Sequence, residues 1–274
     1  MNNQSKAQLS AMIKDTILKE LRSKTLIFIF VATTLMIFLG HALLKLMINS
    51  NGATASIMVS GTNSLTFMFT FINFWSVIIA SIFGISSIQS DFKDKIIYQY
   101  LSFPISRTQY MFTRICGSWL LVYGYYLYAY LLSAILFSFA THSFALSFSH
   151  LLSILLMGLY VFLIIIISFL YSLIAEKIAA FLLVFTTVII ISLSNNSFKN
   201  LTVDEYFKDL GVFKIFGLLI YALLPRLNYI SQLASAVMLK EPIDLNLGLE
   251  ALHLLVSSAL LLIIGNTLIK SKNF

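Results

Sequence analysis

Six long apolar runs dominate this sequence and constrain its fold more than any other feature. Each run reaches at least about 17 residues, the shortest length with which an α-helix crosses the hydrocarbon core of a bilayer. The runs cover residues 25–44, 65–88, 110–140, 151–174, 178–194 and 251–269. Only three prolines occur in 274 residues, so long uninterrupted helices are allowed. The pattern predicts an all-α polytopic membrane protein with six transmembrane helices in a single domain, residues 1–274.

The composition agrees with this prediction. Hydrophobic residues make up 59% of the chain and charged residues 11%, whereas a soluble domain usually has about 25% charged residues. The excess apolar surface is therefore expected to face lipid. The net charge of +7 does not indicate nucleic acid as a partner, because the basic residues lie beside the apolar runs. In that position they are typical of cytoplasmic anchors.

The placement of lysine and arginine predicts the orientation. With both termini in the cytoplasm, the inner segments hold most of these residues: Lys6, Lys14, Lys19, Arg22, Lys24, Lys93, Lys95, Arg107, Arg114, Lys177, Lys270 and Lys272. Positive charge concentrates on the cytoplasmic side of membrane proteins. We therefore expect a multi-pass protein of the cytoplasmic (inner) membrane with both termini inside.

A seventh apolar stretch, residues 212–239, lies in the predicted outer loop 195–250 and is interrupted by Pro225 and Arg226. Each half is too short to cross a bilayer alone. The stretch predicts a broken or re-entrant element before the last span. A full seventh span is disfavoured, because it would carry Lys270 and Lys272 to the outside.

Residues 1–24 predict an amphipathic helix on the inner membrane surface. Apolar residues recur at helical spacing, with basic residues available for the polar side: Leu9, Met12, Ile13, Ile17 and Leu21 against Lys14, Lys19 and Arg22. Such a helix can lie among anionic headgroups. The alternative is an ordinary helix that packs against a partner.

The cytoplasmic segment 89–109 joins the second and third runs and predicts a compact helix over residues 91–103. Asp91 is suited to the N-cap and is spaced to pair with Lys95. An apolar row follows, formed by Phe92, Ile96, Tyr100 and Phe103. Pro104 disfavours helix at the residue before it.

Ser106 and Gln109 then have the spacing of a capping box that begins the next helix. Charged and aromatic side chains on a short stiff helix suit docking into a groove of a soluble partner. The alternative is a connector that only joins two spans.

The run Leu101-Ser-Phe-Pro-Ile-Ser-Arg-Thr-Gln-Tyr110 carries a family resemblance. Together with the amphipathic N-terminal segment and the break at Pro225, it resembles the membrane subunits of ABC-2-type ABC transporters. In size and layout the chain is most similar to permeases associated with multicopper-enzyme maturation. It departs from the family pattern at Ile96 and Ile97, where members commonly have Gly-Thr.

The resemblance implies a permease subunit of an ATP-driven ABC exporter. Two permease copies, identical or related, would pair in the membrane, and a soluble ATPase subunit would bind ATP and Mg on the cytoplasmic side. The coupling helix that docks on this ATPase would comprise Asp91, Phe92, Lys95, Ile96, Tyr100, Phe103, Pro104 and Arg107. The chain itself has no G-x-x-x-x-G-K-[ST] loop, so ATP is expected on another polypeptide.

Few residues suit covalent or metal chemistry. The histidines are scattered along the sequence and form no H-E-x-x-H motif: His41, His142, His150 and His253. The single Cys116 has no local acid–base partner. We therefore expect no enzyme activity in this chain and no catalytic, cofactor or metal site.

Polar residues within the spans are a second candidate site. Tyr123, Tyr126 and Tyr130 share one helix face, and Asn73 lies near the middle of the second run. They are candidates for a substrate path or a dimer seam, and interhelical packing is the alternative.

The predicted spans hold no Asp or Glu at their middle, and Arg114 is expected to extend to the membrane surface. Ion-coupled carriers usually need ionisable groups within the membrane. This argues against a secondary transporter, which stays as one alternative. A non-transporting membrane scaffold is the other.

Overall fold

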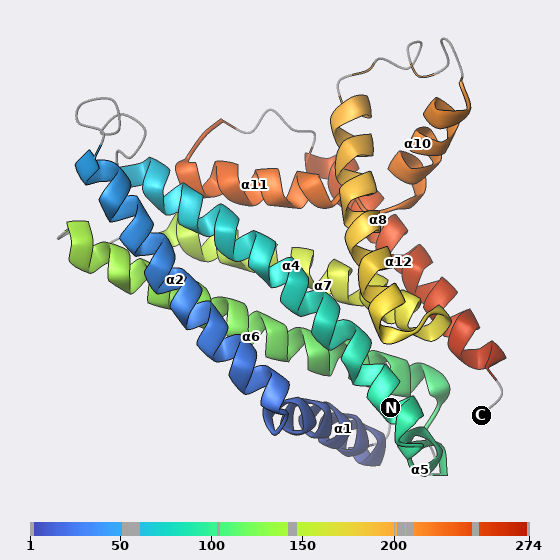
Figure 1. The fold of residues 1–274 in the computed structure, drawn as a ribbon. Coiled ribbons are helices and arrows are strands. Elements are labelled where there is room, and N and C mark those ends of the chain that lie inside the picture. Colours follow the sequence, from blue (N-terminus) through green and yellow to red (C-terminus); the bar gives the residue numbers. More distant parts are fainter. Residues whose placement is uncertain are drawn as a thin grey trace.

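The computed structural model describes residues 3–50, 61–102, 105–141, 147–199, 201, 206, 211–242 and 247–272. All regular structure in these residues is helical (Figure 1). Among them, six helices are long and apolar enough to cross a membrane: α2 (Lys24–Ser50), α4 (Gly61–Lys93), α6 (Arg107–Thr141), α7 (Phe148–Ile174), α8 (Lys177–Phe198) and α12 (Leu247–Ser271). Each predicted run lies inside one of them, which confirms an all-helical, multi-pass membrane protein.

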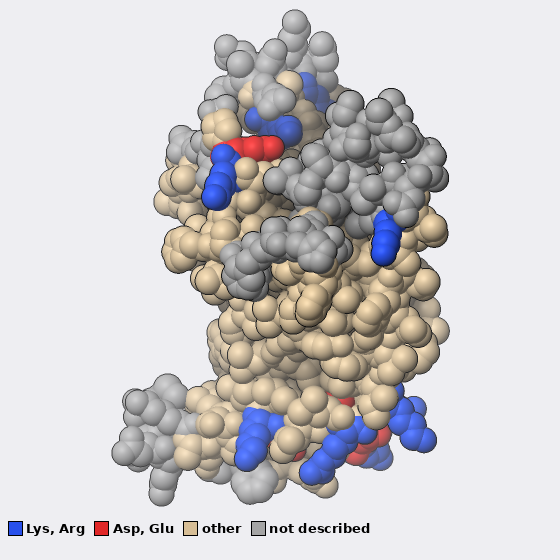
Figure 2. All heavy atoms as spheres, turned by 90° about the vertical axis from the view of Figure 1, so that its left-hand side faces the viewer, with Lys and Arg blue, Asp and Glu red and all other residues tan. Residues whose placement is uncertain are grey.

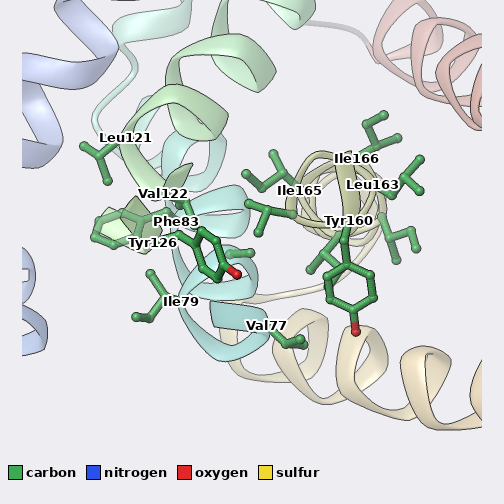
Figure 3. Close-up of a cluster of buried hydrophobic side chains, with 14 of the residues drawn as sticks. Val77, Ile79, Phe83, Leu121, Val122, Tyr126, Tyr160, Leu163, Ile165 and Ile166 are labelled. Carbon is green, nitrogen blue, oxygen red and sulfur yellow. The ribbon is translucent and has the colours of Figure 1, made fainter. Parts of the chain in front are cut away.

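The core is formed by α4, α6 and α7. Within the apolar windows of α4 and α7, 67% of residues are buried, against 17% in α2 and 11% in α12, so the latter two lie at the rim. Figure 3 shows how Phe83 of α4, Val122 of α6 and Ile165 of α7 meet in this core. A Cβ on Gly84 would lie 2.7 Å from Ser168 Cβ, so the small residue allows α4 and α7 to approach closely.

The stretch 212–239 forms two helices, α10 (Val212–Leu223) and α11 (Leu227–Leu239), that meet at an angle of 60°. The break falls where it is predicted, because Pro225 lacks an N–H and disfavours helix at Leu224. In Figure 1, α10 lies beside α8, and α11 runs across the bundle. Ser153 of α7 donates to the carbonyl of Ala234 over 2.7 Å, which fixes α11 to the core.

The first helix, α1 (Asn3–Leu21), and the last turn of α12 lie at the same end of the bundle, opposite α10 and α11 (Figure 1). On the face drawn in Figure 2, lysine and arginine gather at the two ends, and a wide belt between them has no charged side chain. A charge-free belt between two charged ends is the distribution expected of a membrane-spanning protein.

The helix predicted for the N-terminal segment is present, but its packing differs from the expectation. Its buried residues are Met12, Thr16 and Glu20, whereas Leu21 is exposed. This face packs on α6, where a Cβ on Gly117 would lie only 2.7 Å from Thr16 Cβ. Helix α1 therefore packs on its own chain, and its position on the inner membrane surface stays a prediction.

Candidate docking end and its charged cluster

The segment predicted as one helix over residues 91–103 is two helical pieces. Helix α4 continues through Lys93, and a second helix, α5 (Ile96–Ser102), follows a reversal at Lys95, whose φ is 55°. The reversal is stabilised by backbone hydrogen bonds from Asp94 to Ser90 and from Lys95 to Phe92, at 2.9 and 3.2 Å. Phe103 and Pro104 lie outside the described residues.

Asp91 is not an N-cap, and it does not pair with Lys95. Its side chain is fully buried in the last turns of α4. Asp91 Oδ2 lies 2.6 Å from Arg114 Nη2 and accepts a hydrogen bond of 2.6 Å from the Tyr110 hydroxyl. Asp91 Oδ1 lies 2.6 Å from Lys19 Nζ of α1. The partners of Asp91 are on α1 and α6. Helix α4 therefore extends through Asp91, the residue at which a new helix was predicted to begin.

Arg114 does not extend to the membrane surface, contrary to the prediction. Its side chain is 1% exposed. Besides Asp91, its Nη1 donates to Thr16 Oγ1 over 2.6 Å. Its guanidinium carbon lies 4.7 Å from the ring centre of Tyr100 and 5.5 Å from that of Tyr110. Paired and hydrogen-bonded groups of this kind are the condition under which a protein tolerates a buried charge.

Helix α1 is joined to α4 by further polar contacts. Lys19 Nζ donates to Ser90 Oγ over 2.7 Å, and Ser86 Oγ donates to Glu20 Oε1 over 3.1 Å. Burial raises the pKa of Glu20, and the hydrogen bond from Ser86 partly opposes that shift. Ionisable side chains are therefore buried at this end of the bundle, although Glu20 and Asp91 lie outside the predicted spans. We call Asp15, Lys19, Glu20, Asp91, Tyr100, Tyr110 and Arg114 the charged cluster.

Helix α5 packs one side against this cluster. Ile97 is buried, and the Tyr100 hydroxyl donates to Asp15 of α1. Burial raises the pKa of Tyr100, and the hydrogen bond to the Asp15 carboxylate raises it further. Phe92 and Ile96 are half-buried, so these predicted docking residues mainly hold the segment in place.

The opposite side of the segment is exposed. We call it the outer face of α5, and it consists of Lys93, Asp94, Lys95, Tyr98, Gln99 and Ser102. Tyr98 is 53% exposed and is the large apolar side chain of this face. Figure 1 shows α5 at the tip of the bundle, beyond the end of α4. Of the predicted docking residues, Lys95 lies on the outer face of α5. Tyr98 also lies on this face, but it was not among the residues predicted from the sequence.

Arg107 also has an internal role. Its Nη1 donates to the carbonyls of Ile269, Lys270 and Lys272, at 3.2, 2.9 and 2.8 Å, and so joins the start of α6 to the end of α12. The predicted capping box is present, since Ser106 N donates to Gln109 Oε1 over 2.9 Å and Gln109 N donates to Ser106 Oγ over 3.2 Å. The start of α6 is therefore rigidly defined on both sides.

The polar residues of the spans come together inside one chain. Tyr126 donates to Asn73 Oδ1 over 3.1 Å, and its ring centre lies 6.4 Å from that of Tyr123 and 6.5 Å from that of Tyr130. Asn73, Tyr126 and Tyr130 are buried, and Figure 3 shows Tyr126 within the core. In this conformation these three residues pack between helices, and none of them is presented to a second chain.

Sequence reasoning overlooked the Asp91–Arg114 pair, although a signal for it exists. Arg114 lies near the start of one apolar run and Asp91 just beyond the end of the preceding run, so a turn between antiparallel helices brings them to the same level. Ionisable residues at membrane depth usually pair with one another. The contribution of Lys19 carries no such signal, because the packing of α1 is not evident from its apolar spacing.

Within the described part of the chain, no three His, Cys, Asp or Glu side chains lie close enough to hold a metal ion, and His142 falls outside that part. No model of a known protein family and no curated protein matches this sequence.

Proposed function

We propose that this chain is the membrane-spanning permease subunit of an ATP-driven ABC exporter. Its proposed partners are a soluble ATPase subunit, which binds ATP and Mg, and a second permease copy that is identical or related. The proposal rests on the ABC-2 resemblance of residues 101–110 and on one structural observation. A short helix, α5, stands at the tip of the bundle and contacts the charged cluster, whose Asp91–Arg114 pair is buried.

The outer face of α5 has the chemistry of a docking surface. Tyr98 can fill a pocket of the partner, while Lys93, Asp94 and Lys95 supply charges around it. Protein interfaces commonly centre on a buried aromatic residue within a polar rim. Lys95 has a positive φ in the turn before α5, and these side chains are exposed on both sides of that turn.

The charged cluster gives α5 a rigid connection to three other helices. A push on α5 reaches α1 through Tyr100 and Asp15, and Asp91, Lys19 and Arg114 join α1 to α4 and α6. Separating one partner from a buried ion pair costs about 3–5 kcal/mol. The four helices are therefore expected to move as one body, as in rigid-body switching between inward and outward states.

We expect the ATPase to bind at the same end of the bundle. The end that carries α1 and α5 is the end predicted to be cytoplasmic from its lysine and arginine content. Arg107 holds the end of α12 beside the same docking end. A soluble nucleotide-binding subunit docked on α5 would therefore meet the bundle at the ends of α4, α6 and α12.

Co-purification tests the proposal. The tagged full chain is purified from its native membrane, and the ATPase activity recovered with it is measured. Tyr98→Asp places a charge at the centre of the outer face of α5 and should reduce recovery strongly. Ala11→Asp adds the same charge to the exposed side of α1 and should leave recovery unchanged.

Two results would contradict the proposal. One is equal recovery of the ATPase with wild type, Tyr98→Asp and Ala11→Asp. The other is transport by the purified chain alone under an ion gradient, which would indicate an ion-coupled carrier. A complex that forms but neither hydrolyses ATP nor moves any solute would indicate a scaffold.

A further inference from the structure

A narrow apolar groove runs between α4 and α8. Its volume is about 270 Å³, and its walls are formed by Ile82, Ile85, Ile178 and Phe181, with Lys177 as the charged residue of the wall. Ile178 is 78% exposed, so the groove opens away from the core. It therefore faces the lipid that surrounds a membrane protein.

The position of Lys177 is held by α4. Gln89 Nε2 donates to the carbonyl of Ala175 over 2.7 Å and contacts that of Ser172 at 3.4 Å, so it caps the C-terminal end of α7. The turn that follows leads directly into Lys177, the first residue of α8. Lys177 thus stands at one end of the groove, at the same end of the bundle as α1, since it is close enough to Glu20 to interact with its charge.

Acidic neighbours do not neutralise Lys177 directly. Among the described residues it takes part in none of the ion pairs, which are those of Lys19, Arg114 and Arg226. Glu20 is buried, and its carboxylate accepts a hydrogen bond from Ser86 instead of pairing with Lys177. The Lys177 ammonium is therefore available to an anion that approaches from the membrane surface.

We propose that this groove binds an anionic phospholipid, with an acyl chain against Ile82, Ile85 and Phe181 and the headgroup phosphate at Lys177. The groove walls are apolar and carry one lysine, which matches an acyl chain joined to an anionic headgroup better than an apolar helix of a second copy. A lysine at the end of an apolar groove joins apolar contact to attraction for anionic headgroups. The proposal does not depend on ATP coupling.

Lipid titration of the purified full chain tests the site. The protein is stripped of lipid in detergent and titrated with phosphatidylglycerol or with phosphatidylcholine of identical acyl chains, and bound lipid is counted by native mass spectrometry. Wild type should bind phosphatidylglycerol about fivefold more tightly, as expected for one basic residue near an anionic headgroup. Lys177→Gln should lose this preference. Lys93→Gln, at an exposed lysine at the end of α4, should keep it.

A groove-filling variant tests the apolar part. Ile82→Trp should weaken binding of both lipids, while its melting temperature shows whether the protein is folded. Equal binding of the two lipids by wild type would overturn the proposal. An equal loss of the preference in Lys177→Gln and Lys93→Gln would also overturn it, because the preference would then come from overall positive charge. Unchanged lipid binding by folded Ile82→Trp would overturn it as well.

Discussion

At the scale of single residues, the buried pair of Asp91 and Arg114 is the strongest constraint in the molecule. A buried charge is tolerated only with its partners in place. Here the partners come from α1, α4 and α6, so the pair specifies how three helices meet. Removing one of the two charges should therefore lower the free energy of unfolding more than removing both.

Arg114→Met should lower the free energy of unfolding by about 3–5 kcal/mol, because the Asp91 carboxylate stays buried without its main partner. The double variant Asp91→Leu with Arg114→Met should recover much of this loss. Denaturant unfolding in detergent measures both values, and Arg22→Met at an exposed arginine is the matched control. Additive losses in the double variant would show that the two side chains are not coupled.

Glu20 makes the stability of the folded protein depend on pH. Its pKa is raised above the ordinary 4.5, so in the window just above that value the folded state holds a proton that the unfolded state has lost. Stability from this group is therefore present at low pH and falls as pH rises through the window.

Glu20→Gln should flatten that fall, and Glu176→Gln, at an exposed carboxyl on the α7–α8 turn, should not. Melting temperatures in detergent across the acidic pH range provide the measurement. The same slope in wild type and Glu20→Gln would assign the pH dependence to other groups.

At the scale of elements, a long apolar run predicted each spanning helix, because apolar length alone decides whether a helix crosses a bilayer. Local backbone chemistry likewise predicted the break at Pro225 and the capping box of Ser106. The predicted end of the second span and the predicted start of the following helix were wrong, because Asp91 is held by residues of other helices. Tertiary contacts of this kind override local capping preferences.

The packing of α1 on α6 leads to a prediction at this scale. A Cβ on Gly117 would lie 2.7 Å from Thr16 Cβ. Gly124 lies about two turns further along α6, and a Cβ there would meet nothing within 4 Å. Gly117→Ala should therefore force α1 away and destabilise the protein by about 1–3 kcal/mol. Gly124→Ala should be neutral or stabilising, because alanine favours helix over glycine.

Limited proteolysis of the α1–α2 junction and thermal unfolding report these two effects separately. Faster cleavage and a lower melting temperature are expected for Gly117→Ala alone. Equal behaviour of the two glycine variants would show that α1 does not rest on α6 as closely as described.

At the scale of the whole molecule, the position of α10 and α11 decides the topology. Both helices lie at the end opposite α1 and the last turn of α12, and the 60° bend turns α11 across the bundle instead of through it (Figure 1). With six crossings, the two chain ends share one side of the membrane. A seventh crossing would separate them.

Cysteine labelling in intact cells distinguishes these topologies. In a Cys116→Ser background, an impermeant maleimide should label Phe213→Cys, a 93% exposed position at the start of α10. Lys14→Cys and Ser271→Cys, both exposed at the docking end, should react only after the cells are opened. Labelling of Ser271→Cys but not Lys14→Cys from outside would establish a seventh crossing. Labelling of both from outside would reverse the orientation and place α5 where no ATP-hydrolysing partner could reach it.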